Sequence, residues 1–207
     1  MKVLLINGSP HPKGCTWRAL DEVMRTLNEE GIETKLIQVG NQVVRGCIAC
    51  GTCKKKGCCV FDDIVNEAAL EFEDSDALIV GSPVYYGSPN GTLLSFLDRL
   101  FYSTSFSKQM KLGAAVVSAR RGGNTASFDV LNKYFTISSM PVVSSTYWNQ
   151  VHGFTADDVE KDEEGLQVMR NLAHNMAFLL KAIKAQKEEE GLPELERKYS
   201  THFHTGK

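Results

Sequence analysis

The residues best suited to chemistry in this sequence are cysteines. Five of the six lie between residues 47 and 59, where Cys47, Cys50 and Cys53 form a C-x2-C-x2-C pattern. Cys58 and Cys59 follow closely and offer a fourth thiolate. Thiolates at this spacing can wrap one face of an iron-sulfur cube, because the small residues between them let the backbone turn around the cluster. The pattern therefore predicts a metal or redox site.

The cysteine segment allows two alternatives to a [4Fe–4S] cluster. Four thiolates can hold a zinc ion, and thiols without a metal can be redox-active groups. Disulfides are disfavoured, because the sequence passes from Met1 and Lys2 into an apolar strand without a secretory signal. We therefore expect a cytoplasmic protein. The lysines at 54–56 would offset the charge of an anionic cluster, attract an acidic electron carrier, or only solvate the loop.

A second candidate site is the loop that follows the first apolar run. Residues 3–6 predict a buried strand, and apolar residues at helical spacing over 17–27 predict a helix. The loop between them contains glycines and the hydroxyl groups of Ser9 and Thr16. Backbone N–H groups at the start of such a helix bind anions, and we expect Thr16 to be the N-cap. The arrangement predicts a phosphate site.

The sequence of this loop excludes two common phosphate-binding motifs. Five residues separate Gly8 from Gly14, and Cys15 stands where a P-loop would have lysine. The dinucleotide fingerprint G-x-G-x-x-G is absent as well. A loop of neutral donors suits a phosphate monoester.

Strands and helices alternate along the chain. The strands are predicted at 3–6, 34–39, 77–81, 111–118 and 141–146, and the helices around 17–27, 62–72, 93–101, 128–135 and 158–186. This alternation predicts a parallel sheet with right-handed crossovers and helices on both faces. Because parallel strands end at one edge, we expect four segments to converge there on a single site. They are the phosphate loop, the aromatic loop at 82–89, the glycine-bearing loop at 119–125 and the cysteine segment at 40–61.

Composition limits the functional classes. The chain has 207 residues, 43% of them apolar, and a formal net charge of −2. This length suits one well-buried domain, which we place at 1–186, with a charged tail at 187–207. A small negative charge without a basic stripe argues against nucleic-acid binding, and no apolar run in the sequence is long enough to span a membrane.

Several motifs resemble those of a known family. They are Gly8-Ser9-Pro10 with Gly14-Cys15-Thr16, Ser82 to Gly87, and Phe96-Leu97-Asp98-Arg99. In this order and spacing they resemble the flavodoxin-like NAD(P)H-dependent FMN reductases, and the cysteine set resembles the iron-sulfur flavoproteins within that group. The resemblance covers residues 1–186. It implies an α/β flavodoxin-like fold, a doubly wound five-stranded parallel sheet of order 2-1-3-4-5 with FMN where the strand order reverses.

The resemblance also implies roles for particular residues. The FMN phosphate would be held by Ser9, His11, Cys15 and Thr16. The isoalloxazine ring would lie along Pro83, Val84, Tyr85, Tyr86 and Gly87, with Arg120, Gly122 and Gly123 at its far edge. The cluster ligands would be Cys47, Cys50, Cys53 and Cys59, since Cys59 fits the fourth position better than Cys58. Asp98 and Arg99 are expected to form a local pair on their helix.

The resulting hypothesis is an FMN-dependent oxidoreductase with a nicotinamide or ferredoxin-type electron donor. The flavin would carry the chemistry, so we assign no catalytic side chain. The alternative is a non-enzymatic flavin-binding or metal-binding redox sensor. We expect a homodimer or homotetramer, with the cysteine segment and the tail at 187–207 near the subunit interface.

Overall fold

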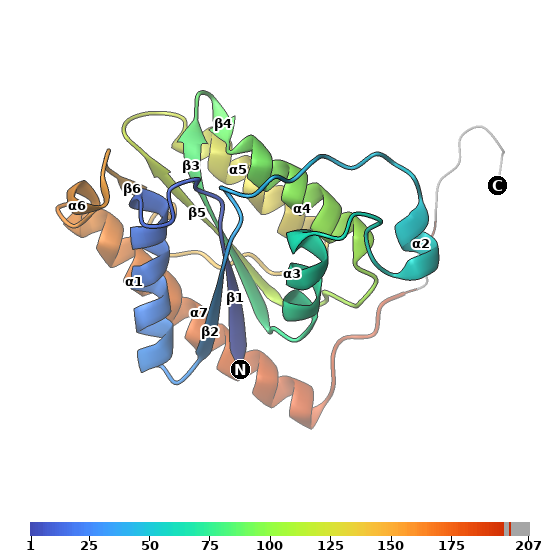
Figure 1. The fold of residues 1–207 in the computed structure, drawn as a ribbon. Helices are drawn as coiled ribbons and strands as arrows, with labels where there is room; N and C mark the ends of the chain where they lie inside the picture. The colour runs from blue at the N-terminus through green and yellow to red at the C-terminus, as the bar shows by residue number, and fades with distance from the viewer. Residues whose placement is uncertain (197–198, 200–207) are drawn as a thin grey trace.

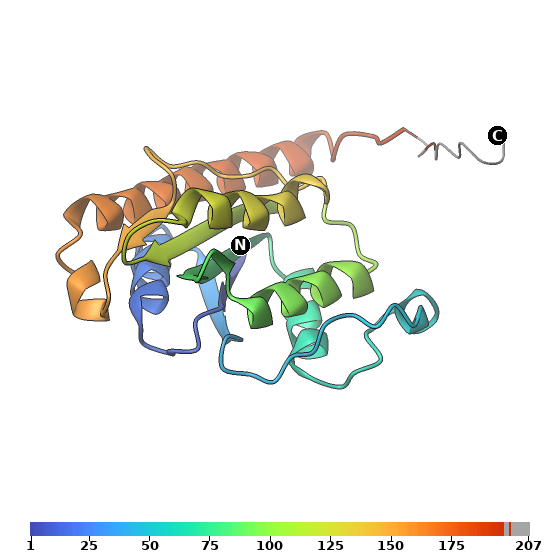
Figure 2. The same ribbon diagram turned by 90° about the horizontal axis from the view of Figure 1, so that it is seen from above.

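The computed structural model describes residues 1–196 and residue 199, and it consists of a twisted sheet with helices on both faces (Figures 1 and 2). The strands are β1 (Lys2–Asn7), β2 (Glu33–Gln38), β3 (Ala77–Tyr85), β4 (Ser88–Pro89), β5 (Leu112–Ala119) and β6 (Gln150–His152). The helices are α1 (Cys15–Glu29), α2 (Thr52–Lys56), α3 (Ile64–Glu73), α4 (Gly91–Ser103), α5 (Asn124–Thr136), α6 (Ala156–Val159) and α7 (Glu163–Glu189).

The predicted α/β class and strand order are confirmed. The parallel strands follow the order β2-β1-β3-β5-β6, while the two-residue β4 pairs antiparallel with the end of β3. With β4 set aside, β5 and β6 are the fourth and fifth strands of the predicted order 2-1-3-4-5. Successive residues of β1 enter opposite apolar layers: Val3 packs on the α1 and α7 side, and Leu4 on the side of α3, α4 and α5. The unbroken apolar run of β1 therefore reflects burial on both faces.

The position predicted for the fifth strand is wrong. Residues 141–146 meet the sheet through one bridge between Gly113 and Val142, whereas β6 pairs in register with β5. The apolar pattern there has another cause, since Val143 is buried in the core beneath α7. Burial against a helix, and not strand pairing, selects these side chains.

Two helix predictions are also corrected. α1 begins at Cys15 with Gly14 as its N-cap, so Thr16 lies inside the helix and is not its cap. The single helix predicted at 158–186 is divided into α6 and α7, each with its own N-cap. Within the described residues, no helix combines the length and the apolarity needed to cross a bilayer.

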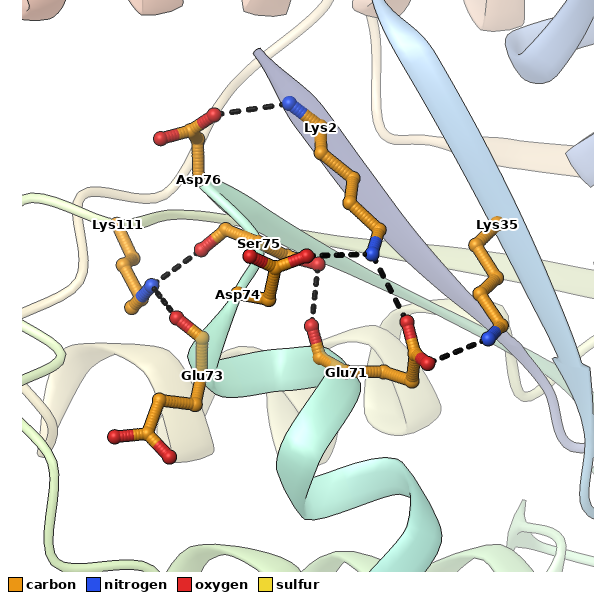
Figure 3. Close-up of polar contacts among 8 residues, drawn as sticks. All are labelled: Lys2, Lys35, Glu71, Glu73, Asp74, Ser75, Asp76 and Lys111. Atoms are coloured by element: carbon orange, nitrogen blue, oxygen red, sulfur yellow. Dashed lines mark hydrogen bonds and ion pairs between the residues drawn. The ribbon is translucent and has the colours of Figure 1, made fainter.

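Lysines from the amino edge of the sheet fix the end of α3 (Figure 3). Lys111, just before β5, donates to the main-chain carbonyl groups of Glu73, at 2.9 Å, and of Ser75. Lys2 of β1 binds Glu71 at 3.0 Å. Cations at a helix C-terminus satisfy orphan carbonyls and oppose the helix dipole. This network positions α3 at the end of the sheet opposite to the carboxyl edge.

Candidate functional site

A pocket of about 690 Å³ opens at the carboxyl edge of the sheet, between the loop after β1, the ends of β3 and β5, and the turn before α6. This volume is typical of small-molecule sites. Most of the residues predicted to bind FMN line it, namely Ser9, His11, Cys15, Thr16, Pro83, Val84, Tyr85 and Arg120. They meet because the strand order reverses between β1 and β3, which leaves a crevice at their carboxyl ends.

The remaining four predicted residues lie on neighbouring segments. Tyr86 and Gly87 form the tip of the hairpin between β3 and β4, where Tyr86 is fully exposed. Gly122 and Gly123 precede α5, and Gly123 has a φ of +94°. A Cβ at Gly123 would meet the Val84 side chain at 2.8 Å, so glycine permits the α5 loop to pack on the end of β3. Their contacts with a flavin ring remain predictions.

Side chains of β1 and β2 hold the loop that leads into α1. Asn7 Oδ1 accepts from the Ser9 N–H at 3.0 Å, and Ser9 Oγ accepts from the His11 N–H at 3.1 Å. Gln38 Nε2 donates to the Ser9 carbonyl oxygen at 2.6 Å. The first-turn N–H groups of α1 lie at the end of this ordered loop, where they are available to an anion. Asn7 and Gln38 were missed from sequence, although both are polar residues at strand ends.

A buried hydroxyl pair forms the floor of the pocket. Thr16 Oγ1 and Ser118 Oγ are 2.8 Å apart, with exposed fractions of 1% and 3%. The pair joins α1 to β5, and one of its two hydroxyl hydrogens remains available to a ligand. Sequence analysis missed Ser118, but a polar residue at the end of the apolar run of β5 was a detectable signal.

The turn before α6 supplies a further wall that was not predicted. Phe154, Thr155 and Ala156 line the pocket. Thr155 and Asp158 form a capping box, which fixes the start of α6. The T-x-x-D pattern at 155–158 could have located this helix start, but nothing local to it indicated proximity to the loop after β1.

Thr16→Val is expected to lower the free energy of unfolding by about 1–3 kcal/mol, because it leaves the buried Ser118 hydroxyl without a partner. The Ser118→Ala variant leaves the buried Thr16 hydroxyl group without its partner instead. The double variant should cost less than the sum of the two single variants, since both polar partners are then removed. Urea denaturation of the four proteins measures this coupling, and strictly additive costs would contradict it.

Cys15 contributes to the pocket as a neutral group. It is the first residue of α1 and is half-buried. Burial raises the pKa of the Cys15 thiol. The thiol therefore stays protonated at neutral pH, which favours a contact role over a nucleophilic one.

A second pocket contains the four cysteines predicted to bind a cluster. Cys47, Cys50, Cys53 and Cys59 all line it. Cys58 does not line the pocket, and its side chain is exposed. The backbone turns sharply at both ends of α2, where Gly51 and Gly57 are left-handed. Folding of this segment thus gathers the predicted ligands and favours Cys59 over Cys58.

The cysteine pocket is separate from the larger pocket, which corrects the expectation of one converging site. Its remaining wall includes Arg99, Tyr102 and Ser103 from the C-terminal half of α4. Figures 1 and 2 both place α2 beyond α4, on the side away from α6 and β6. The segment leaves the carboxyl edge after Gly40 and follows α4, because α4 and the start of α3 hold its polar groups.

The cysteine pocket, of about 20 Å³, gathers four thiol groups of the kind that bind iron-sulfur clusters. Within the described residues, no group of three or more His, Cys, Asp or Glu side chains is close enough to hold a single metal ion. A cluster is wider than one ion and needs thiolates around a cavity, together with donors toward its sulfur atoms. Ser103 is buried, and its Oγ has no hydrogen-bond partner in the described part of the chain. This pocket therefore has both thiols and a spare hydroxyl donor.

Asp98 and Arg99 do not form the local pair expected from sequence. Asp98 Oδ1 accepts from the Tyr134 hydroxyl group on α5. Arg99 instead binds Asp63, the N-cap of α3, through two hydrogen bonds of 2.7 and 2.8 Å. Adjacent residues on a helix point in different directions, so each finds a partner on a different neighbouring element.

A doubly wound sheet with this strand order and a pocket at its reversal point defines the flavodoxin-like class. A solved flavodoxin from the domain Archaea has the same fold, with a TM-score of 0.60 at 16% identity over 87% of this chain and 99% of that chain. The predicted flavodoxin-like fold is confirmed by this likeness.

The chain belongs to the NADPH-dependent FMN reductase family, whose profile matches residues 1–155. An iron-sulfur flavoprotein from Methanocaldococcus jannaschii is 34% identical over 192 residues, which is 89% of this chain and 100% of the relative. An iron-sulfur flavoprotein from Methanosarcina thermophila is 28% identical over 193 residues, which is 91% of this chain and 100% of the relative. The protein is thus an FMN-dependent oxidoreductase, as the resemblance implied.

Proposed function

We propose that the protein binds FMN in the pocket at the carboxyl edge and passes electrons through it from NAD(P)H or a ferredoxin-type donor. The pocket that joins the loop after β1 to the end of β3 is the observation that carries this proposal. Bound FMN would supply the redox chemistry, by accepting a hydride or single electrons. The chain would supply binding, orientation and exclusion of water.

The loop and the start of α1 would hold the FMN phosphate. Backbone N–H groups of α1 provide the positive end of a 15-residue helix, and the hydroxyl groups of Ser9 and Thr16 add neutral donors. His11 and Cys15 complete this wall. Neutral donors of this kind suit a phosphate monoester whose negative charge is partly compensated by the helix dipole.

The isoalloxazine ring would lie along Pro83, Val84, Tyr85, Tyr86 and Gly87. Tyr85 is 44% exposed and Val84 is partly buried, so the two offer an apolar surface that remains accessible from solvent. Arg120, Gly122 and Gly123 would flank the other edge of the ring, where Arg120 adds a cation. An accessible ring face is what a soluble electron donor requires.

We further propose that Cys47, Cys50, Cys53 and Cys59 hold a [4Fe–4S] cluster. The proposal is supported by the pocket that these four cysteines share, and by relatives that are named iron-sulfur flavoproteins. Exposed lysines at 54–56 would balance the negative charge of the thiolates. Such a cluster would accept or deliver one electron at a time.

We propose a cytoplasmic homodimer or homotetramer. None of the six cysteines is paired in a disulfide in the described structure, as is usual for proteins of a reducing compartment. Large apolar side chains are exposed at Tyr86, Phe154 and Phe178, and a second copy could cover them. The predicted docking of the tail at 187–207 lies partly outside the described residues, because 197, 198 and 200–207 are not described. A monomer in sedimentation at micromolar concentration would contradict the oligomer.

Anaerobic steady-state kinetics with the FMN-loaded protein tests the donor. We expect oxidation of NADH or NADPH well above that seen with free FMN at the same concentration, because the protein orients the flavin for hydride transfer. If a one-electron donor reduced the flavin while both nicotinamides failed, the ferredoxin-type donor would remain and nicotinamide oxidation would be excluded. Failure with every donor would contradict the oxidoreductase assignment.

A further inference from the structure

We propose that Arg99 is a positioning residue of the cysteine pocket, which holds the Cys59 sulfur in place and makes the cluster easier to reduce. Arg99 Nε donates to Cys59 Sγ at 3.3 Å. This inference rests on the proposed cluster.

The side chain of Arg99 connects three segments around the cysteines. Its two terminal nitrogens bind Asp63 at 2.7 and 2.8 Å, and Nη1 also donates to the carbonyl oxygen of Arg45 at 3.3 Å. The guanidinium carbon lies 5.0 Å from the centre of the Phe61 ring. Because the carboxylate occupies the terminal nitrogens, Nε is free to donate to Cys59.

Burial of the Arg99 guanidinium group carries a desolvation cost that its partners must offset. Arg99 is 1% exposed and is the largest of the fully buried side chains in the described part of the chain. A buried arginine is tolerated only when its charge is paired and its donors are used. Asp63 pairs the charge, although its carboxyl group is 25% exposed and so is partly screened by water. The guanidinium group therefore keeps a net positive influence on the sulfur beside it.

A positive donor to a cluster sulfur favours the reduced state. One-electron reduction adds a negative charge to the cluster, and that charge is shared with the ligand sulfur atoms. An N–H···S hydrogen bond stabilises the more negative state, which is a general way in which proteins raise the potential of iron-sulfur centres. The Nε–H of Arg99 points at one ligand only, so its effect is exerted through Cys59.

The chain offers matched variants for a test. Arg99→Lys keeps the charge but removes the Nε–H donor, whereas Asp63→Asn removes the counter-charge and keeps an N-cap side chain for α3. Arg18 and Glu22 form another ion pair, at 2.8 Å, on the far side of the sheet, in which Arg18 is buried and Glu22 is partly buried. Arg18→Lys and Glu22→Gln therefore repeat the two changes away from the cysteines.

The test is an anaerobic potentiometric titration of the full-length holoprotein. The EPR signal of the reduced cluster is recorded at each potential and gives the midpoint potential. Iron, acid-labile sulfide and FMN are quantified first. For Arg99→Lys we expect reduction to be about tenfold less favourable, a shift of about 59 mV to lower potential. For Asp63→Asn we expect a shift to higher potential, because the charge of Arg99 is no longer neutralised. Both control variants should retain the wild-type potential.

The opposite signs of the two potential shifts distinguish an effect of Arg99 on the reduction potential from a merely structural role. An unchanged potential in Arg99→Lys, or shifts of the same sign in both variants, would overturn the inference. Where Arg99→Lys fails to assemble a cluster, the sign of the Asp63→Asn shift decides. A wild-type preparation with FMN but without iron would overturn the proposed cluster and this inference with it, and the initial iron analysis distinguishes that outcome from a failure of Arg99 alone.

Discussion

Alanine at position 40 is expected to weaken FMN binding by about a hundredfold, which corresponds to about 2.8 kcal/mol. A Cβ on Gly40 would lie 2.2 Å from the Gly8 carbonyl oxygen and 2.3 Å from that of Ser9. These are backbone atoms, so no side-chain rotation can relieve the overlap. The loop proposed to hold the phosphate must therefore shift away from residue 40, and overpacking of this kind also costs about 1–3 kcal/mol of stability.

The control for this prediction is Gly46→Ala, on the same segment. A Cβ there would meet only the Ser95 Oγ, at 3.9 Å, which is an ordinary contact. Isothermal titration of both flavin-depleted variants with FMN measures the effect. Wild-type affinity in Gly40→Ala, together with an unchanged unfolding midpoint, would show that the loop is not held by this close approach.

Cys59→Ser is expected to remove the cluster, whereas Cys58→Ser should keep it. The two residues are adjacent, yet Cys59 lines the cysteine pocket and accepts a hydrogen bond from Arg99, while Cys58 is exposed. Anaerobic analysis should return about four irons and four sulfides per chain for the wild type and for Cys58→Ser. FMN content should be equal in all three proteins, because the pocket proposed for FMN is formed by other segments.

The reverse pattern, with iron lost from Cys58→Ser alone, would assign the fourth ligand to Cys58. Zinc without acid-labile sulfide in the wild type would favour the structural zinc alternative. Samples must be kept anaerobic, since exposed thiolate-bound clusters are readily oxidised.

The family resemblance supplied the sheet order, and the sequence located much of the pocket at the carboxyl edge of the sheet. Local periodicity identified β1, β2, β3 and β5 but not the short β4, and the loop at 7–16 lies directly between a strand and a helix that it connects. Parallel strands then require that the loops after β1, β3 and β5 meet at one edge. Ser9, Thr16, Val84 and Arg120 could therefore be grouped without coordinates, although their contacts with FMN remain predictions.

The features that were missed depend on partners distant in the chain. Ser118 lies 102 residues from Thr16, and Arg99 lies 36 residues from Asp63. No periodic pattern encodes such pairs, because they arise only after helices and strands have packed. The misplaced fifth strand has the same origin, since Val143 is apolar for burial against a helix. The course of the cysteine segment was likewise set by α4 and not by the strand that precedes it.

FMN titration of the purified, flavin-depleted wild-type protein tests the central claim most directly. The structure predicts saturation at about one FMN per chain, since a single chain forms the phosphate loop, the β3 wall and the Arg120 wall of the pocket. The bound flavin should show a perturbed absorbance spectrum and should be reducible by the donor that supports turnover. Protein that carries no flavin absorbance as purified, and that takes up no FMN on titration, would contradict the account.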